Sequence, residues 1–245
     1  MSVDEHQIKA IQFYQAGLSC IENQQFGEAL THLDKAISLD TMEPTFHFQR
    51  GIALMHMIRY QDAVDAFEKS LQYDNKNPTT LIYTGINYLF MGRYSKAIPC
   101  FDKALEIEPN NVMALSHKGS CLSEIDHHAE AVACFDKILA KDPHDVNSLF
   151  NKGVSLLKLR AFEDARDAFK AIVKIDPDDY DSWFELGKAF MGMKKYDDSV
   201  KCFDQVIRIE PNHMEVWETK MECLRALGKT DEAEKLAAKR EADMW

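Results

Sequence analysis

The chain has 245 residues, of which 46% are hydrophobic and 28% charged, with a formal net charge of -11. This balance is typical of a folded protein and excludes a disordered chain as the default. The acidic charge leaves no basic surface for a phosphate backbone, so we expect no nucleic-acid partner. Because no apolar run reaches the roughly 18 residues that a spanning helix needs, we also expect no membrane span.

Six cysteines are spread along the chain without a C-x-x-C pair, and the first ten residues, MSVDEHQIKA, are polar. A secretory signal would place an apolar stretch there. We therefore predict a reducing, cytoplasmic setting and free thiols throughout. These thiols belong to Cys20, Cys100, Cys121, Cys134, Cys202 and Cys223.

The first predicted element is a helix that begins close to the N-terminus. Ser2 is followed three residues later by Glu5, which is the pattern of a capping box at a helix start. A regular repeat starts only at residue 10. The first helix is therefore expected to extend several residues ahead of the repeat.

Four kinds of residue recur every 34 positions along the chain. A period of this length indicates an array of repeated supersecondary units. Glycine occupies one position of the period, a small residue the second, a large apolar residue the third and proline the fourth. In that order the residues are Gly17, Gly51, Gly85, Gly119, Gly153 and Gly187; Ala29, Ala63, Ala97, Ala131, Ala165, Ser199 and Ala233; Leu33, Phe67, Phe101, Phe135, Phe169 and Phe203; and Pro109, Pro143, Pro177 and Pro211.

The order of these residues resembles the tetratricopeptide repeat family, for instance in the segment NKGVSLLKLRAFEDARDAFKAIVKIDP at 151–177. The resemblance covers nearly the whole chain. It implies an all-α fold, a right-handed superhelical solenoid of helix-turn-helix repeats. It also implies a single domain over 1–245, with repeats at 10–43, 44–77, 78–111, 112–145, 146–179, 180–213 and 214–245.

The last of these repeats departs from the pattern. Met221 replaces the glycine, Ala237 replaces the large apolar residue, and the final helix is rich in charged side chains. Solenoids end in polar repeats because the terminal surface faces water. We therefore interpret 214–245 as a C-terminal cap.

Capping and turn residues divide each repeat into two helices, A and B. Asn77 precedes Pro78, which fits a helix start, and Asp145 and Asp179 fall at the same position of later repeats. Aromatic residues such as Tyr60 lie at the turn between the helices and are expected to wedge between neighbouring hairpins. The glycine is expected to let helix A lie close against helix B.

No motif of a catalytic or nucleotide-binding site occurs in the chain, neither a glycine-rich phosphate loop nor G-x-S-x-G nor H-E-x-x-H. We therefore predict that the protein is not an enzyme and carries no cofactor. The nearest approach to a metal site lies in the fourth repeat. Its cysteines occupy positions that are apolar in other repeats, which favours core packing over metal binding. The residues concerned are His117, Cys121, His127, His128 and Cys134.

The resemblance implies that the A helices line the concave side of the solenoid. Positions 2, 5, 9 and 12 or 13 of each A helix share a face and are expected to be exposed there. In the first three repeats this face is mostly apolar, which is typical of a binding surface. The candidate groove residues, including a basic spot formed by the two lysines, are Ile11, Tyr14, Leu18, Phe48, Ile52, Ile82, Tyr83, Ile86, Phe90, Phe150, Lys158, Phe184 and Lys188.

Leu18, Ile52 and Ile86 each follow the repeated glycine and point away from it on a helix. If they are exposed, replacing Ile52 and Ile86 with glutamate is expected to spare stability and to remove partner binding. The alternative is that tight superhelical curvature or the first helix covers them.

One subtype of the family does not fit these residues. Members that hold the acidic tails of chaperones carry lysine at position 5 of an A helix as part of a carboxylate clamp. Here that position is never lysine, so we expect no such clamp. The residues at position 5 are Tyr14, Phe48, Ile82, Ser116, Phe150, Phe184 and Glu218.

We therefore predict a protein-protein interaction adaptor or scaffold that binds an apolar or amphipathic helical segment in the groove of repeats one to three. Two alternatives stay open. The same groove could bind a second copy of the chain, or the chain could be the regulatory subunit of an enzyme complex.

Overall fold

Helices that alternate as A and B make up the whole structure, a computed structural model that describes the backbone of residues 3–243 and the side chains of residues 5–238. Over this range it contains fourteen α-helices and no strand. The helices form two compact units, Met1–Ile125 and Asp126–Trp245. An all-α solenoid of helix-turn-helix repeats is thereby confirmed, whereas the prediction of a single domain stays a prediction.

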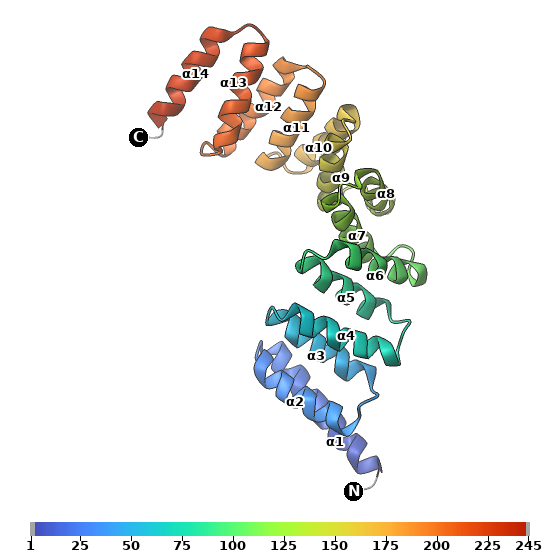
Figure 1. The fold of residues 1–245 in the computed structure, drawn as a ribbon. Helices are drawn as coiled ribbons and strands as arrows, with labels where there is room; N and C mark the ends of the chain where they lie inside the picture. Colours follow the sequence, from blue (N-terminus) through green and yellow to red (C-terminus); the bar gives the residue numbers. More distant parts are fainter. Residues whose placement is uncertain (1–2, 244–245) are drawn as a thin grey trace. The chain divides into compact units, whose positions relative to one another are not determined.

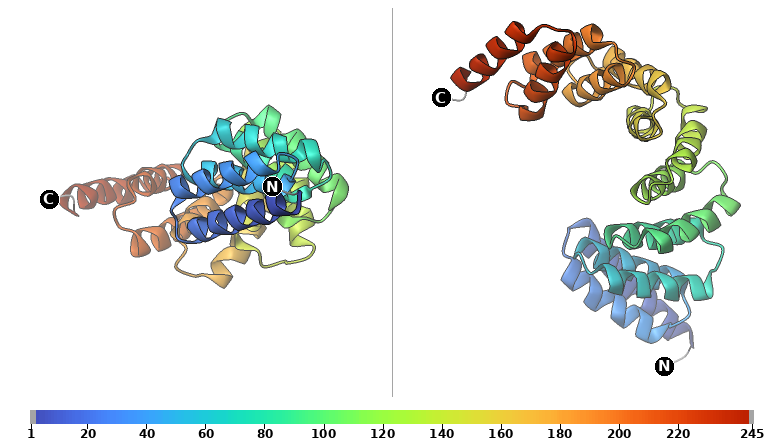
Figure 2. Two further views of the ribbon diagram at one scale, coloured as in Figure 1. Left: turned by 90° about the horizontal axis from the view of Figure 1, so that it is seen from below. Right: turned by 45° about the horizontal axis from the view of Figure 1, so that its top comes forward.

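In the first unit each helix packs against the next one in the chain, and the A helices α1 and α3, and α5 and α7, also contact each other. Figure 1 labels these helices, and the further views in Figure 2 keep α1 to α4 side by side. Helix α1 begins at Val3, ahead of the repeat as expected, although Ser2 of the predicted capping box lies outside the described residues. The bounds are α1 Val3–Glu22, α2 Phe26–Leu39, α3 Pro44–His56, α4 Tyr60–Tyr73, α5 Pro78–Phe90, α6 Tyr94–Ile107 and α7 Val112–Glu124.

The second unit repeats this packing, with contact between the A helices α9 and α11. Its bounds are α8 His128–Leu139, α9 Val146–Lys158, α10 Phe162–Ile175, α11 Tyr180–Gly192, α12 Tyr196–Ile209, α13 Met214–Ala226 and α14 Thr230–Asp243.

The repeated glycine faces the repeated large apolar residue in the hairpins α1–α2, α3–α4, α5–α6, α9–α10 and α11–α12. A methyl group built on Gly85 would lie 2.7 Å from the ring of Phe101, and one on Gly153 would lie 2.6 Å from the ring of Phe169. Both rings are fully buried. The glycine therefore lets helix A approach helix B until the aromatic ring fills the space that a side chain would take.

Polar side chains at the start of the A helices confirm the predicted caps. The Asn77 side chain accepts a hydrogen bond from the backbone N–H of Thr80 at 3.1 Å, and the Asp145 side chain accepts one from Ser148 at 2.7 Å. Asp179 does the same for Ser182 at 3.2 Å. Each bond satisfies an amide that has no partner inside its helix.

The aromatic residues at the turns contact the following repeat as predicted. The Tyr60 ring lies 5.3 Å from the ring of Phe90, one repeat further along the chain. The Phe26 ring stacks on His56 in the same relation at 4.7 Å. These contacts fix the distance between successive hairpins at the turn end.

Two residues after the end of every A helix the backbone adopts left-handed geometry. Ile58 has φ 62° and Gly92 has φ 67° at equivalent positions. After the first of these, the backbone N–H of Arg59 donates to the carbonyl of Leu54 at 3.0 Å, which closes the helix in the manner of a Schellman motif. A β-branched residue is strained in this conformation. Burial does not compensate for this strain, because Ile58 is 71% exposed.

Replacing Gly85 with alanine tests the close approach of the helices. We expect the free energy of unfolding to fall by about 1–3 kcal/mol, because the added methyl overpacks against Phe101. The matched control is Gly27→Ala in α2, where a methyl group would meet nothing within 4 Å. That change is expected to be neutral or to stabilise by up to about 1 kcal/mol through helix propensity. Equal effects of the two changes in urea denaturation would contradict the packing role of Gly85.

Exchanging residues at the left-handed position tests the strain at Ile58. We expect Ile58→Gly to raise the free energy of unfolding by about 0.5–1 kcal/mol, since relief of strain exceeds the entropy cost of glycine. The reciprocal change, Gly92→Ile, is expected to lower it by about 1–2 kcal/mol. Denaturation curves measure both, and an unchanged Gly92→Ile variant would show that the position carries no strain.

Candidate protein-binding site

A hollow of about 650 Å³ lies between α1 and α3 on the side formed by the A helices. Three candidate groove residues from α1, namely Ile11, Tyr14 and Leu18, line it. Its other lining residues are Gln7, Ala10, Gln15, Asp40, Glu43, Thr45 and Phe46. The hollow thus has apolar walls with polar groups at its edge, which is the usual make-up of a ligand-binding surface.

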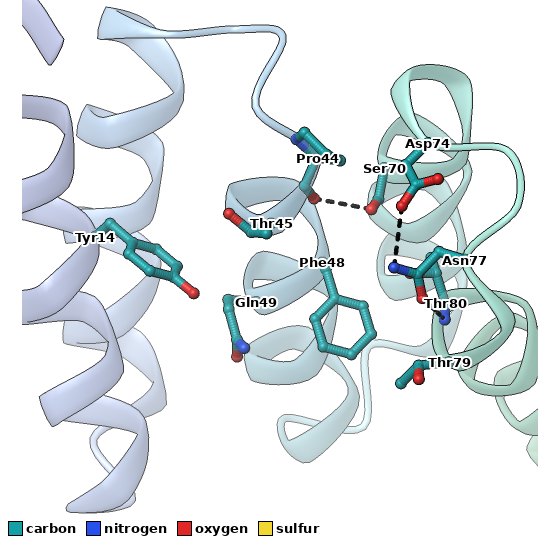
Figure 3. A pocket seen from close by; sticks show the side chains of 10 residues that line it. All are labelled: Tyr14, Pro44, Thr45, Phe48, Gln49, Ser70, Asp74, Asn77, Thr79 and Thr80. Carbon is teal, nitrogen blue, oxygen red and sulfur yellow. Dashed lines mark hydrogen bonds between the residues drawn. The ribbon is translucent and has the colours of Figure 1, made fainter.

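A second hollow, of about 260 Å³, continues from the first towards α5 and shares Tyr14 and Thr45 with it. Figure 3 shows Tyr14 of α1 on one side, Phe48 of α3 in the middle and Thr79 of α5 on the other side. Its far wall is held by hydrogen bonds, because the Ser70 hydroxyl donates to the carbonyl of Pro44 at 2.8 Å. Together the two hollows form one surface over α1, α3 and the start of α5, which we call the α1–α3 groove.

The edge of the α1–α3 groove carries acids that sequence reasoning missed. Asp40 directly follows α2, and Glu43 caps α3 by accepting a hydrogen bond from the Thr45 amide at 3.2 Å. Both lie in the connection between two hairpins, outside the helical positions that the repeat register selects. Their place at the groove follows from the short turn, which returns the chain to the start of the next A helix.

Phe48, which lines the second hollow, belongs to a cluster of aromatic rings. The Phe48 ring lies 5.6 Å from both Phe67 and Tyr83, and the rings of Phe67 and Tyr83 lie 6.0 Å apart. Ile52 packs against the same cluster and is half-buried. Phe48, Ile52 and Tyr83 are therefore half-buried packing residues, and of the three only Phe48 lines a hollow of the groove.

Three candidate residues are buried instead of exposed, so the expectation of their exposure is wrong. Ile82, Ile86 and Phe184 keep only 3%, 7% and 6% of their surface. The next A helix covers them, since α7 supplies Ala114 to the cluster that holds Ile82 and Ile86. The Phe184 ring lies 4.9 Å from the ring of His213, the residue that directly precedes α13. Glutamate at Ile86 would consequently bury a charge and is expected to unfold the protein.

The remaining candidates are scattered over both units. Phe90 is exposed, and Phe150 packs edge-on against Phe169 at 5.7 Å. Lys158 is exposed at the end of α9. Lys188 pairs with Glu185 at 2.8 Å, and its Nζ lies 5.3 Å from the centre of the Phe184 ring. Of the residues in the second unit, none lines the α1–α3 groove.

All six cysteines are free, and four of them, Cys121, Cys134, Cys202 and Cys223, are buried. Burial raises the pKa of the Cys121 and Cys202 thiols to about 12 and that of the Cys100 thiol to about 11. Burial also lowers the pKa of His117. Because nucleophilic attack requires the thiolate, these shifts describe structural cysteines rather than reactive ones.

Within residues 5–238, where side chains are described, no group of three or more His, Cys, Asp or Glu residues is placed to hold a metal ion. Among the helices of the described region, none combines the length and the apolar character that crossing a bilayer requires.

Sequence profiles of the tetratricopeptide repeat match the chain at residues 14–78 and 122–180, at 80–111 and 180–213, and at 100–133. The chain belongs to the tetratricopeptide repeat family. No curated protein sequence matches it significantly.

Solved structures share the fold at low sequence identity. MamA, residues 41 to the end, from Desulfovibrio magneticus RS-1 is 20% identical with a TM-score of 0.67, over 70% of this chain and 97% of its own. YrrB, described as a tetratricopeptide repeat protein with an unusual peptide-binding site, is 22% identical with a TM-score of 0.58, over 89% and 95%. A tetratricopeptide repeat protein from Parabacteroides merdae is 16% identical with a TM-score of 0.72, over 96% and 93%.

Because their thiols are buried, Cys121 and Cys202 are expected to react slowly with thiol reagents in the native protein. With a pKa of about 12, roughly 10⁻⁴ of Cys121 and Cys202 is thiolate at pH 8, against about a quarter of an ordinary thiol. We expect a disulfide reagent to label both far more slowly in the native state than in denaturant, as followed by absorbance and peptide mass spectrometry. Rapid labelling of either residue in the native protein would contradict the burial.

Proposed function

We propose that the protein is an interaction adaptor or scaffold that binds an apolar or amphipathic helical segment of a partner in the α1–α3 groove. The observation that carries the proposal is the position of Ile11. This side chain is 50% exposed and lines a hollow of about 650 Å³ together with Tyr14 and Leu18. A helix laid across the groove would remove these apolar surfaces from water.

The acids at the edge of the groove indicate which charge the partner carries. Asp40 and Glu43 flank the apolar walls, so the partner helix is expected to carry lysine or arginine beside its apolar stripe. The described part of the chain contains no strand, so the groove has no strand edge to which an extended segment could add, and this favours a helix. Membership of a family of helical-repeat proteins fits a binding role rather than catalysis.

Replacing Ile11 tests whether the partner binds in the groove rather than on another part of α1. Ile11→Glu is expected to change stability by no more than about 0.5 kcal/mol, because half of the side chain already faces water. Burying the exposed half of the isoleucine against a partner is worth about 0.8–1.5 kcal/mol, so its loss weakens binding by roughly 4- to 12-fold. Quantitative affinity capture from the native source, followed by titration of the captured partner, measures the change.

The matched control is Ile8→Glu. Ile8 lies one turn earlier on the same helix, is 57% exposed and does not line the hollow. The substitution Ile8→Glu adds the same charge to the same helix as Ile11→Glu. We expect it to leave binding unchanged, and equal binding by both variants, or equal loss in both, would contradict the assignment of the groove.

Sedimentation equilibrium of the purified protein addresses self-association through the same groove. A dimer that Ile11→Glu dissociates and Ile8→Glu preserves would make the partner a second copy of the chain. Capture of an enzyme whose activity changes on binding would support the regulatory subunit instead.

A further inference from the structure

A ladder of ion pairs joins successive repeats on the side of the B helices. In each pair, an acid in helix B of one repeat meets a base in helix A of the next, in the same register. Lys118 pairs with Asp102 at 2.6 Å and Lys152 pairs with Asp136 at 2.6 Å. The other members of the ladder are Arg50 with Asp34 and Lys220 with Asp204.

The ladder is interrupted at two junctions. Between α4 and α5 the acid is kept as Glu68 and Thr84 replaces the base, whereas between α10 and α11 both positions change. At this junction the position of the acid holds Lys170 and the position of the base holds Leu186. Lys170 places its Nζ over the ring of Phe190, 5.6 Å from the ring centre. A base has therefore replaced an acid, and an apolar residue has replaced the base that would have neutralised it.

A hollow of about 650 Å³ lies over this junction, between α10 and α12 with α11 at its base. Trp183, Leu186 and Phe190 form an apolar floor, and five cationic side chains surround it. The cations are Arg166, Lys170, Lys174, Lys195 and Lys201. We call this surface the α10–α12 groove.

The positive charge of the α10–α12 groove is only partly neutralised. Arg166 pairs with Asp167 at 2.7 Å and Lys201 pairs with Asp198 at 3.0 Å. Among the described side chains, no carboxylate lies within ion-pair distance of the other three cations, Lys170, Lys174 and Lys195. The chain as a whole has a net charge of -11, so these three cations around one aromatic floor form a basic patch on an acidic protein.

The equivalent hollow one repeat earlier has the opposite charge. It lies between α8 and α10, and Asp136, Asp164 and Asp167 line it with a single base, Lys152. That base is already paired within the ladder. Repeat geometry alone therefore does not produce a basic groove, and the sign of the charge is a property of the α10–α11 junction.

We propose that the α10–α12 groove binds an acidic segment of a protein partner in which an aromatic or other apolar side chain lies among the acids. The carboxylates would pair with Lys170, Lys174 and Lys195, and the apolar side chain would rest on Trp183 and Phe190. This surface lies on the side of the B helices and is separate from the α1–α3 groove.

A nucleic acid fits this surface less well than an acidic peptide. A phosphate backbone gains affinity from a row of cations along its length. Here the cations occupy one hollow that Asp198 also lines, and Asp167 and the acidic hollow of the preceding repeat lie beside them. A short segment that places a few carboxylates around one apolar side chain matches both the floor and the charge.

Fluorescence anisotropy with a fluorescein-labelled peptide, Glu-Phe-Glu-Glu-Phe-Glu, tests the proposal on the full chain. We expect binding that weakens as sodium chloride rises from about 0.05 to about 0.5 M, because exposed charges are screened. The counterpart Glu-Ala-Glu-Glu-Ala-Glu should bind more weakly, since it leaves the floor uncovered.

Two variants locate the binding. Lys170→Asp with Leu186→Lys rebuilds the ion pair found at other junctions and is expected to weaken binding of the Glu-Phe peptide by at least about tenfold. Lys174→Glu with Lys195→Glu changes only exposed side chains and is expected to do the same, so it carries the test if the first variant fails to fold. Circular dichroism verifies that each variant is folded.

The matched control is Lys137→Glu with Lys235→Glu, which changes the net charge equally at exposed sites outside the groove. It should bind the peptide like the wild type. Equal binding by the Lys174 and Lys195 double variant, or tighter binding of labelled oligo(dT) than of the peptide, would overturn the proposal.

Discussion

The contact between the repeated glycine and the repeated aromatic residue is the constraint on which the rest of the structure depends. Because Gly85 has no side chain, the Phe101 ring can lie directly against the backbone of helix A. The two helices of a hairpin are thereby held closer than larger residues would permit. Close packing of the two helices fixes the positions of the turn and of the capped start relative to each other. The next hairpin can then stack on it by contacts such as Tyr60 on Phe90.

A repeated scaffold makes departures from the repeat informative. The ion pair of Asp136 and Lys152 recurs in the same register at three further junctions, Asp34 with Arg50, Asp102 with Lys118 and Asp204 with Lys220. Lys170 and Leu186 break that rule without removing the stacking of α10 and α11. The free energy of the lost ion pair was small, since partly exposed pairs contribute about 1 kcal/mol or less. A junction can therefore exchange that pair for a surface with a different use at little cost in stability.

The candidate site was only partly predictable from the repeat register. Ile11, Tyr14 and Leu18 follow from helical periodicity and do line a hollow. Ile82 and Ile86 have the same periodicity, yet they are buried, because the following A helix covers them. Whether a position faces solvent depends on how closely the neighbouring repeat approaches, and that distance is set by side chains more than 30 residues away in the chain. Helical periodicity specifies a direction around one helix and carries no information about its neighbours.

The sequence by itself determined the helices, their caps, the pairing into hairpins and the role of the glycine. Each of these depends on residues within one repeat, where the spacing of side chains on a helix fixes which of them meet. The tertiary structure alone decided that Asp40 and Glu43 edge the α1–α3 groove and that five cations surround Trp183 and Phe190. These surfaces combine residues of two or three helices from successive repeats. Their shape depends on the packing distance between helices, which summed local preferences do not contain.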